Sequence, residues 1–182
     1  MTVNIKPSKL SGKVTAPSSK SMCHRLLICA GLSEGKSEIK NVLFSEDILA
    51  SLDCLKAMGA EIQTDGDTVT VIGTLPNKSA GGVYNCRESG STLRFFIPLA
   101  MMSKGESVFK GYGRLMERPM SVYEDISREK NIPYSKTDEG IKVGQGLASG
   151  KFTVPGNISS QFISGLLFAL PLLKEKSVIR LT

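Results

Sequence analysis

The chain has 182 residues, of which 41% are apolar and 22% are charged, so it is long enough for one domain with its own hydrophobic core. Its net charge of +6 comes from dispersed Lys and Arg residues, aromatic residues make up only 6%, and there is no Trp. Because nucleic acids are bound on basic surfaces that carry stacking aromatics, this composition argues against a nucleic acid partner and favours small anionic ligands.

The histidine and cysteine residues narrow the chemistry further. His24 is the one histidine, which argues against a histidine-based zinc site and against a Ser-His-Asp triad. The four cysteines form no C-x-x-C pair, which is typical of free thiols in a reducing compartment, so we expect a cytoplasmic location and no metal. The longest apolar stretch, residues 162–173, is too short to cross a membrane, and no membrane partner is expected.

The first elements along the chain form a unit with the order β-α-β-α-β-β, from about residue 13 to about residue 75. Its elements are expected as a strand at 13–17, a helix that begins near Lys20, a strand at 37–42, a helix at 46–58 and a hairpin at 61–72. The helix at 46–58 is the best defined, because Leu, Ile and Met recur on one face, Ser45 suits its N-cap and Gly59 suits its end.

The same order returns in a second unit, over about residues 82–145. Its elements are expected as a strand at 83–86, a helix after the turn at 88–92, a strand at 107–110, a helix from near Pro119 to about 130, and a hairpin at 132–143. The repetition of one element order in two consecutive stretches predicts a repeat architecture.

A third unit begins at about residue 150 and is incomplete. It contains a strand at 151–155, a helix after the turn at 156–161, and a strand at 177–181, but no second helix or hairpin. We therefore expect residues 1–182 to be the N-terminal domain of a longer protein whose C-terminal domain is absent from this sequence.

The first helix of each unit is apolar nearly all round, which is typical of a helix that is buried on every side. We expect an α/β domain with pseudo-threefold symmetry, in which these three helices lie at the centre and the sheets and amphipathic helices lie outside. Each central helix starts from a turn of small residues, which leaves free N–H groups at the positive end of the helix dipole. Three such turns, if brought together, would hold a ligand with several negative groups.

Basic residues stand at or near two of these turns. Lys20 opens the first helix, where its charge opposes the helix dipole unless an anion neutralises it, although an exposed lysine that binds nothing is the alternative. Arg25 lies in the same apolar helix and needs an anionic partner if it is buried. Arg94 has the equivalent place in the second unit, where a structural ion pair is equally possible.

Two further segments suit anion binding. In the loop before Pro119, Arg114 and Arg118 are four residues apart and together could clamp a carboxylate or phosphate, although pairing with Glu117 is a fair alternative. The run Ser159-Ser160-Gln161 offers hydroxyl, amide and backbone donors at the start of a helix, although by itself it is a common capping pattern.

Four motifs in this order resemble the enolpyruvyl transferase family over the whole chain, and within it the branch that acts on shikimate 3-phosphate. The motifs are Pro17-Ser18-Ser19-Lys20-Ser21 with Arg25, Glu88-Ser89-Gly90-Ser91-Thr92-Leu93-Arg94, Arg114-Leu115-Met116-Glu117-Arg118-Pro119-Met120, and Ser159-Ser160-Gln161-Phe162. The resemblance implies transfer of the enolpyruvyl group of phosphoenolpyruvate to the 5-hydroxyl of shikimate 3-phosphate with release of phosphate, in aromatic amino acid biosynthesis. It implies no metal or organic cofactor, a complete enzyme that is a monomer, and little or no turnover by this chain alone.

The resemblance also implies roles for individual residues. Lys20 would be catalytic and would contact both substrates, with Asp47 and Arg94 in support. The residues expected to bind shikimate 3-phosphate are Lys20, Ser21, Arg25, Ser159, Ser160 and Gln161. The residues expected to bind phosphoenolpyruvate are Lys20, Gly90, Arg118 and Gln161. Gly90 would allow the ligand to approach the backbone, where a side chain would intrude.

The sequence departs from the family pattern at two turns and leaves two other functions open. Ser18 replaces the usual Gly of the first motif, and Glu88-Ser89 replaces the usual Asn-Ala of the second. The branch that transfers enolpyruvyl to UDP-N-acetylglucosamine carries a reactive Cys in the loop that corresponds to residues 111–120 and an Asn after the lysine, whereas here the loop has no Cys and Ser21 follows Lys20. The third alternative is a non-catalytic interaction domain, whose basic charge would serve an acidic protein partner.

Overall fold

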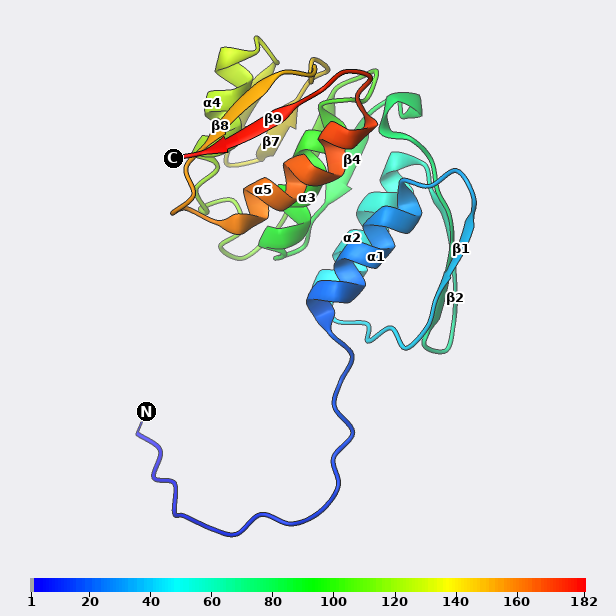
Figure 1. The fold of residues 1–182 in the computed structure, drawn as a ribbon, viewed down its shortest axis with the longest axis vertical. Helices are drawn as coiled ribbons and strands as arrows, with labels where there is room; N and C mark the ends of the chain where they lie inside the picture. The colour runs from blue at the N-terminus through cyan, green and yellow to red at the C-terminus, as the bar shows by residue number, and fades with distance from the viewer. Residues whose placement is uncertain (1) are drawn as a thin grey trace.

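The computed structural model describes residues 2–182, which form a packed body with a long N-terminal tail (Figure 1). Met1, the first residue of the expected domain, lies outside the described residues. The prediction of a strand at residues 13–17 is wrong, because residues 2–19 form neither a helix nor a strand and are exposed. An isolated strand leaves its backbone groups without partners, and within the described chain no strand pairs with this segment.

The first sheet follows the tail. Its unit consists of α1 (Lys20–Gly31), β1 (Lys36–Ile39), α2 (Glu46–Met58), β2 (Glu61–Asp65) and β3 (Thr68–Ile72). The strands pair antiparallel in the order β1-β3-β2. Helix α2 has the predicted bounds, because Ser45 Oγ accepts a hydrogen bond from the Ile48 N–H at 3.5 Å and Gly59, with φ 111°, ends the helix in the left-handed conformation.

The second sheet contains the complete element order. After the short 3₁₀ helix η1 (Pro76–Lys78) come β4 (Gly82–Asn85), α3 (Gly90–Ala100), β5 (Ser107–Lys110), α4 (Ser121–Glu129), β6 (Tyr134–Thr137) and β7 (Gly140–Val143). The sheet order is β4-β5-β7-β6, with β4 parallel to β5 and the other pairs antiparallel. Helix α4 begins at Ser121, near Pro119 as predicted, because Met120 is its N-cap and is not helical (φ −127°, ψ 17°).

The third sheet has two parallel strands, β8 (Lys151–Val154) and β9 (Val178–Leu181). They are joined by α5 (Ser160–Ala169) and the 3₁₀ helix η2 (Leu170–Leu172). Parallel strands need such a crossover connection, and β4-α3-β5 in the second sheet has the same form. The fold class is therefore confirmed as α/β.

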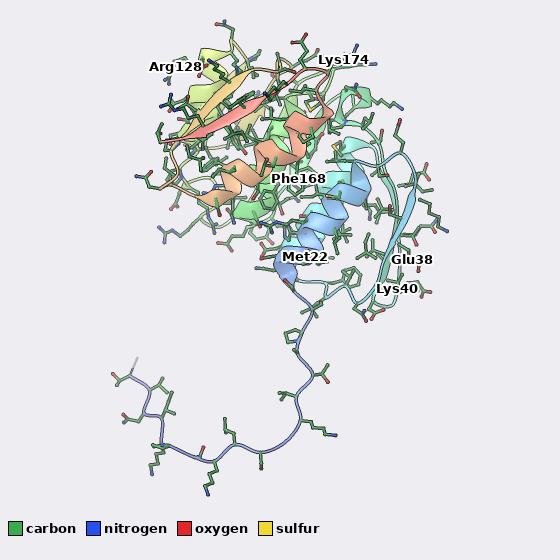
Figure 2. All side chains as sticks on the ribbon, in the orientation of Figure 1. Met22, Glu38, Lys40, Arg128, Phe168 and Lys174 are labelled. Atoms are coloured by element: carbon green, nitrogen blue, oxygen red, sulfur yellow. The ribbon has the colours of Figure 1, made fainter. Side chains whose placement is uncertain are left out.

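The helices are packed into one hydrophobic core, but they are not equally buried. Helix α3 packs closely on α5, where a Cβ on Gly165 would lie 2.3 Å from the Arg94 carbonyl oxygen, so only glycine allows this approach. Helix α1 packs on α2 and keeps an exposed apolar side, on which Met22 is 57% and Leu26 48% exposed. Figure 2 labels Met22 at the start of this helix. The prediction that every first helix is buried all round is therefore wrong for α1, and Leu167 of α5 is 58% exposed as well.

In residues 2–182 no helix combines the length and the hydropathy that a membrane span requires.

Candidate functional site

The three helices that follow the small-residue turns have the same start. Ser19, Ser89 and Ser159 are the N-caps of α1, α3 and α5, and each side chain accepts a backbone hydrogen bond at 3.2–3.3 Å. None of these helices has an acidic residue in its first turn, in contrast to α2, which has Glu46 and Asp47 there. The helices run in the same general direction, with their first turns on the lower side of the view (Figure 1). Their positive dipole ends are therefore not compensated by their own side chains.

Lys20, the first residue of α1, is paired with Asp47 of α2 at an Nζ–Oδ2 distance of 2.5 Å. Burial by itself would raise the pKa of Asp47, but hydrogen bonds from Lys20 and Ser89 outweigh burial and lower this pKa below its usual value. Asp47 is thus ionised at neutral pH and orients a charged Lys20. Because the Lys20 side chain is 56% exposed, its other N–H groups remain open to an anionic ligand.

Arg25 lies one turn further along α1 and is exposed. It therefore does not need the anionic partner that a buried arginine would require. Its Nη1 donates to the Ser21 carbonyl at 2.8 Å, and its guanidinium lies 5.8 Å from the centre of the Phe95 ring. Among residues 2–182 no carboxylate pairs with it. Arg25 is therefore held by contacts with uncharged groups, and no carboxylate of the described residues competes with a ligand for it.

Arg94 of α3 joins the second unit to the third. Its Nη1 donates to Gln161 Oε1 at 2.6 Å, and its guanidinium lies 5.0 Å from the centre of the Phe162 ring. Burial and the nearby Arg118 charge lower the pKa of Arg94. The structural ion pair considered from the sequence is absent among the described residues, because Arg94 contacts an amide and an aromatic ring instead of a carboxylate.

Arg94 and Arg118 meet above Gly90, the first residue of α3. A Cβ on Gly90 would lie 2.3 Å from Arg118 Nη1 and 3.3 Å from Arg94 Nη1, so the two guanidiniums can come together only over a glycine. In the part of the chain that the structure describes, neither arginine has a carboxylate partner. Two adjacent guanidiniums without a counter-charge, at the positive end of a helix, have the chemistry that suits an anion.

Of the two arginines predicted to clamp an anion, only Arg118 is without a carboxylate partner among the described residues. Arg114 Nε donates to Glu117 Oε2 at 3.1 Å, which is the alternative considered from the sequence, and the pair is exposed. Arg118 makes no such pair, and its carbonyl accepts a hydrogen bond from Lys136 at 3.0 Å. Arg118 therefore lies against Gly90, whereas the charge of Arg114 is neutralised by Glu117.

The start of α5 completes the set of predicted residues. Ser159 Oγ accepts from the Gln161 N–H at 3.3 Å, Ser160 is exposed, and Gln161 is held by Arg94. Ser21 is exposed in the first turn of α1.

Sequence reasoning missed a buried chain of polar side chains behind Lys20. His24 Nδ1 lies 3.2 Å from Ser51 Oγ, Ser51 Oγ lies 3.0 Å from Thr92 Oγ1, and Thr92 Oγ1 donates to Ser89 Oγ at 2.8 Å. Burial lowers the pKa of His24 to about 4, so its ring is neutral at physiological pH. The signal in the sequence was the presence of Ser51 and Thr92 within otherwise apolar helix faces, since buried hydroxyls require partners.

Across residues 2–182 there is no group of three or more His, Cys, Asp or Glu side chains that could hold a metal ion.

The chain is similar to proteins of one family. A family model described as EPSP synthase (3-phosphoshikimate 1-carboxyvinyltransferase) matches residues 5–182. The 3-phosphoshikimate 1-carboxyvinyltransferases of Clostridium perfringens (strain ATCC 13124) and Clostridium kluyveri are each 47% identical to it, over 99% of this chain and 43% of theirs. The chain therefore spans about 43% of the length of the curated relatives it matches.

Two solved structures share the fold. EPSP synthase from Acinetobacter baumannii superposes with a TM-score of 0.79 and 25% identity, over 92% of this chain and 40% of that one. The enolpyruvyl transferase NikO from Streptomyces tendae superposes with a TM-score of 0.58 over 87% of this chain and 38% of that one, and its 13% identity shows the fold alone.

Proposed function

The chain belongs to the EPSP synthase family, and we propose that it supplies one wall of a 3-phosphoshikimate 1-carboxyvinyltransferase site. The observation that carries this proposal is the meeting of Arg94 and Arg118 over Gly90, at a helix start, without a carboxylate partner in the described chain. Uncompensated guanidiniums at a helix N-terminus suit the phosphate or the carboxylate of phosphoenolpyruvate.

The reaction that we propose joins two anionic substrates. The 5-hydroxyl oxygen of shikimate 3-phosphate loses its proton and bonds to C2 of phosphoenolpyruvate, while C3 gains a proton and the C2–C3 double bond becomes a single bond. The tetrahedral intermediate then loses phosphate from C2 and a proton from C3, which restores the double bond. Because both substrates carry several negative charges, the site has to supply cations and helix N-termini that hold them together.

The residues divide between the two substrates. In our proposal, phosphoenolpyruvate contacts Gly90, Arg118 and Gln161, while Lys20 lies between the substrates and stabilises the charge that develops during addition. The residues that we assign to shikimate 3-phosphate are Lys20, Ser21, Arg25, Ser159, Ser160 and Gln161. Asp47 orients Lys20 through the 2.5 Å pair, and Arg94 orients Gln161 through the 2.6 Å hydrogen bond.

We propose that the complete enzyme needs more than this chain. The chain spans 43% of its curated relatives, so we propose that the remainder of the protein supplies the opposing wall with the acid and base groups. We further propose that this enzyme acts as a cytoplasmic monomer in aromatic amino acid biosynthesis.

Titration of the ¹⁵N-labelled chain tests the proposal. Phosphoenolpyruvate should shift the amide signals of Gly90 and Gln161, and shikimate 3-phosphate should shift those of Ser21 and Ser160, at millimolar concentrations. Arg118→Ala should weaken phosphoenolpyruvate binding, whereas Arg114→Ala is the matched control, because that arginine is already paired with Glu117.

Two results would contradict the assignment. One is the absence of shifts with either substrate at millimolar concentration. The other is preferential binding of UDP-N-acetylglucosamine, which would place the chain in the other branch of enolpyruvyl transferases.

A further inference from the structure

Arg87 precedes the Glu88–Gly90 turn and has an unusual backbone conformation. Its φ is 52°, and in residues 2–182 the only other non-glycine residues with positive φ are Asn41 and Asn131. Asparagine tolerates the left-handed region better than arginine does, because its short side chain hydrogen-bonds locally. This conformation is held by backbone hydrogen bonds, one of them from the Arg87 N–H to Asn85 Oδ1 at 3.1 Å, and by the contacts of the Arg87 side chain.

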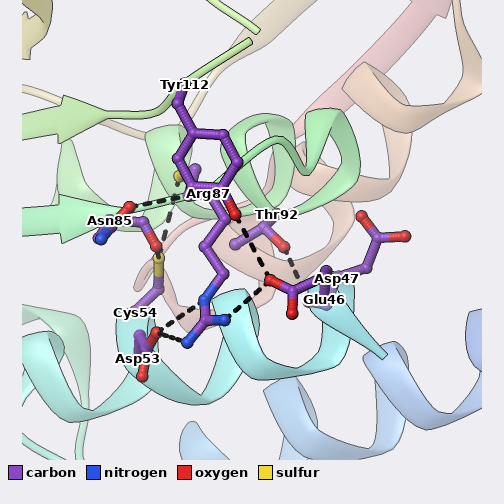
Figure 3. Close-up of polar contacts among 9 residues, drawn as sticks. Glu46, Asp47, Asp53, Cys54, Asn85, Arg87, Thr92 and Tyr112 are labelled. Carbon is purple, nitrogen blue, oxygen red and sulfur yellow. Dashed lines mark hydrogen bonds and ion pairs between the residues drawn. The ribbon is translucent and has the colours of Figure 1, made fainter. Parts of the chain in front are cut away.

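The Arg87 side chain reaches α2 and binds two carboxylates there (Figure 3). Its Nε and Nη2 donate to Asp53 Oδ2 at 3.1 and 2.9 Å, and its Nη1 donates to Glu46 Oε2 at 2.8 Å. These two carboxylates also raise the pKa of Arg87. The charge of Arg87 is thus fully engaged by α2, so this arginine is not available to hold a substrate.

The backbone of Arg87 holds the loop that leads to Arg118. Its carbonyl accepts a hydrogen bond from the Tyr112 N–H at 2.8 Å, and a Cβ on Gly111 would lie 2.5 Å from this same carbonyl oxygen. The Tyr112 hydroxyl donates in turn to Glu46 Oε2 at 3.4 Å (Figure 3). The same residue therefore contacts α2 with its side chain and the loop with its backbone.

Three parts of the candidate site meet at this point. Glu46 is adjacent to Asp47, which holds Lys20; Arg87 leads into Gly90; and Tyr112 begins the loop that carries Arg118. We propose that Arg87 is a positioning residue, which sets the distance between the Lys20–Asp47 pair and Arg118 and so preforms the seat for phosphoenolpyruvate. The identity of this ligand rests on the proposed function, whereas the positioning role rests on the contacts of Arg87.

Arg87→Gly tests this role, because glycine accepts the left-handed backbone and only the side-chain contacts are lost. Phosphoenolpyruvate presents two anionic groups that need the correct spacing, while inorganic phosphate presents one. In NMR titrations of the chain, we expect the dissociation constant for phosphoenolpyruvate to rise about tenfold, less than the roughly hundredfold that a misplacement of about 1 Å can cost. The value for inorganic phosphate should change less than about twofold, because one group needs no spacing.

Asn131→Gly is the matched control, since Asn131 has nearly the same φ (55°) and lies just beyond α4. It should leave both dissociation constants at the wild-type values. Equal weakening of both ligands by Arg87→Gly, or no weakening of phosphoenolpyruvate, would overturn the positioning role.

Glu46→Gln provides a second variant that keeps the shape of the partner and removes its charge. If Arg87 and Glu46 act together, combining the two substitutions should weaken phosphoenolpyruvate binding little more than Arg87→Gly alone, and fully multiplicative effects would overturn the role. If the wild-type chain binds neither ligand, the proposed function fails. The positioning role is then decided by hydrogen exchange at the Tyr112 amide, which should be faster in Arg87→Gly and would refute the role if it is unchanged.

Discussion

Gly90→Ala disturbs the candidate site by an amount that the structure defines. The added Cβ would lie 2.3 Å from Arg118 Nη1, whereas ordinary contact begins at 3.4 Å, so the guanidinium has to move by the difference of about 1.1 Å. A displacement of about 1 Å can cost roughly a hundredfold, or about 2.7 kcal/mol, in a site that depends on orientation. We therefore expect phosphoenolpyruvate to bind about a hundredfold more weakly, while shikimate 3-phosphate binds with unchanged affinity.

The stability of the Gly90→Ala chain should not fall. The closest clash is with the end of the exposed, flexible Arg118 side chain, and alanine is a better helix former than glycine. NMR titration gives the two affinities, and urea denaturation gives the free energy of unfolding.

Gly156→Ala is the matched control, because it changes a glycine in the turn before α5, where the nearest atoms would be 3.7 and 3.9 Å from the new Cβ. The reasoning is refuted if Gly90→Ala binds phosphoenolpyruvate within twofold of the wild type. It is also refuted if the affinity for shikimate 3-phosphate falls as much as that for phosphoenolpyruvate.

Two further predictions concern Lys20 and the residue behind it. Lys20→Ala should cost the complete enzyme at least about 3 kcal/mol of transition-state binding, measured as kcat/KM. Lys78→Ala, which loses only an exposed pair with Glu34, serves as its control, and near-normal turnover of Lys20→Ala would contradict its role. Because burial lowers the pKa of His24 from 6.5 to about 4, its contribution to stability is present above about pH 6.5 and is lost as the pH falls towards 4. The C2 proton of this single imidazole should titrate near pH 4 in NMR spectra, and a midpoint near 6.5 would show that the ring is not buried.

Local signals predicted most of the elements, and non-local pairing explains the main failure. Helix α2 was predicted with its exact bounds because its cap, its periodicity and its terminal glycine all lie within the segment. The strand at residues 13–17 was expected from its place in the repeated element order, but a strand exists only if another strand pairs with it, and a local pattern does not contain that information. Within the described chain the free edge of β1 and this segment remain apart.

The candidate site shows the same division. The placement of Lys20 and Gly90 at the repeated turns, and of Arg118 in a basic loop, indicated an anion site, and the structure brings Gly90 and Arg118 together. The spacing of Arg114 and Arg118 did not distinguish them, because the choice depends on which guanidinium reaches Glu117 and which reaches α3, and only the family resemblance singled out Arg118. Arg87 was missed because its role arises from carboxylates that lie 34 and 41 residues away.

The close approach of α3 and α5 at Gly165 has a thermodynamic consequence. Arg94 lies on α3, in the unit of the second sheet, and Gln161 lies on α5, in the unit of the third sheet. The hydrogen bond between these two side chains therefore joins the two units. A ligand that contacts both Gly90 of the second unit and Gln161 of the third would hold the two units together. Ligand binding and the packing of the two units against each other would then be thermodynamically coupled. The free energy by which the ligand stabilises the packing would equal the free energy by which the packing strengthens ligand binding.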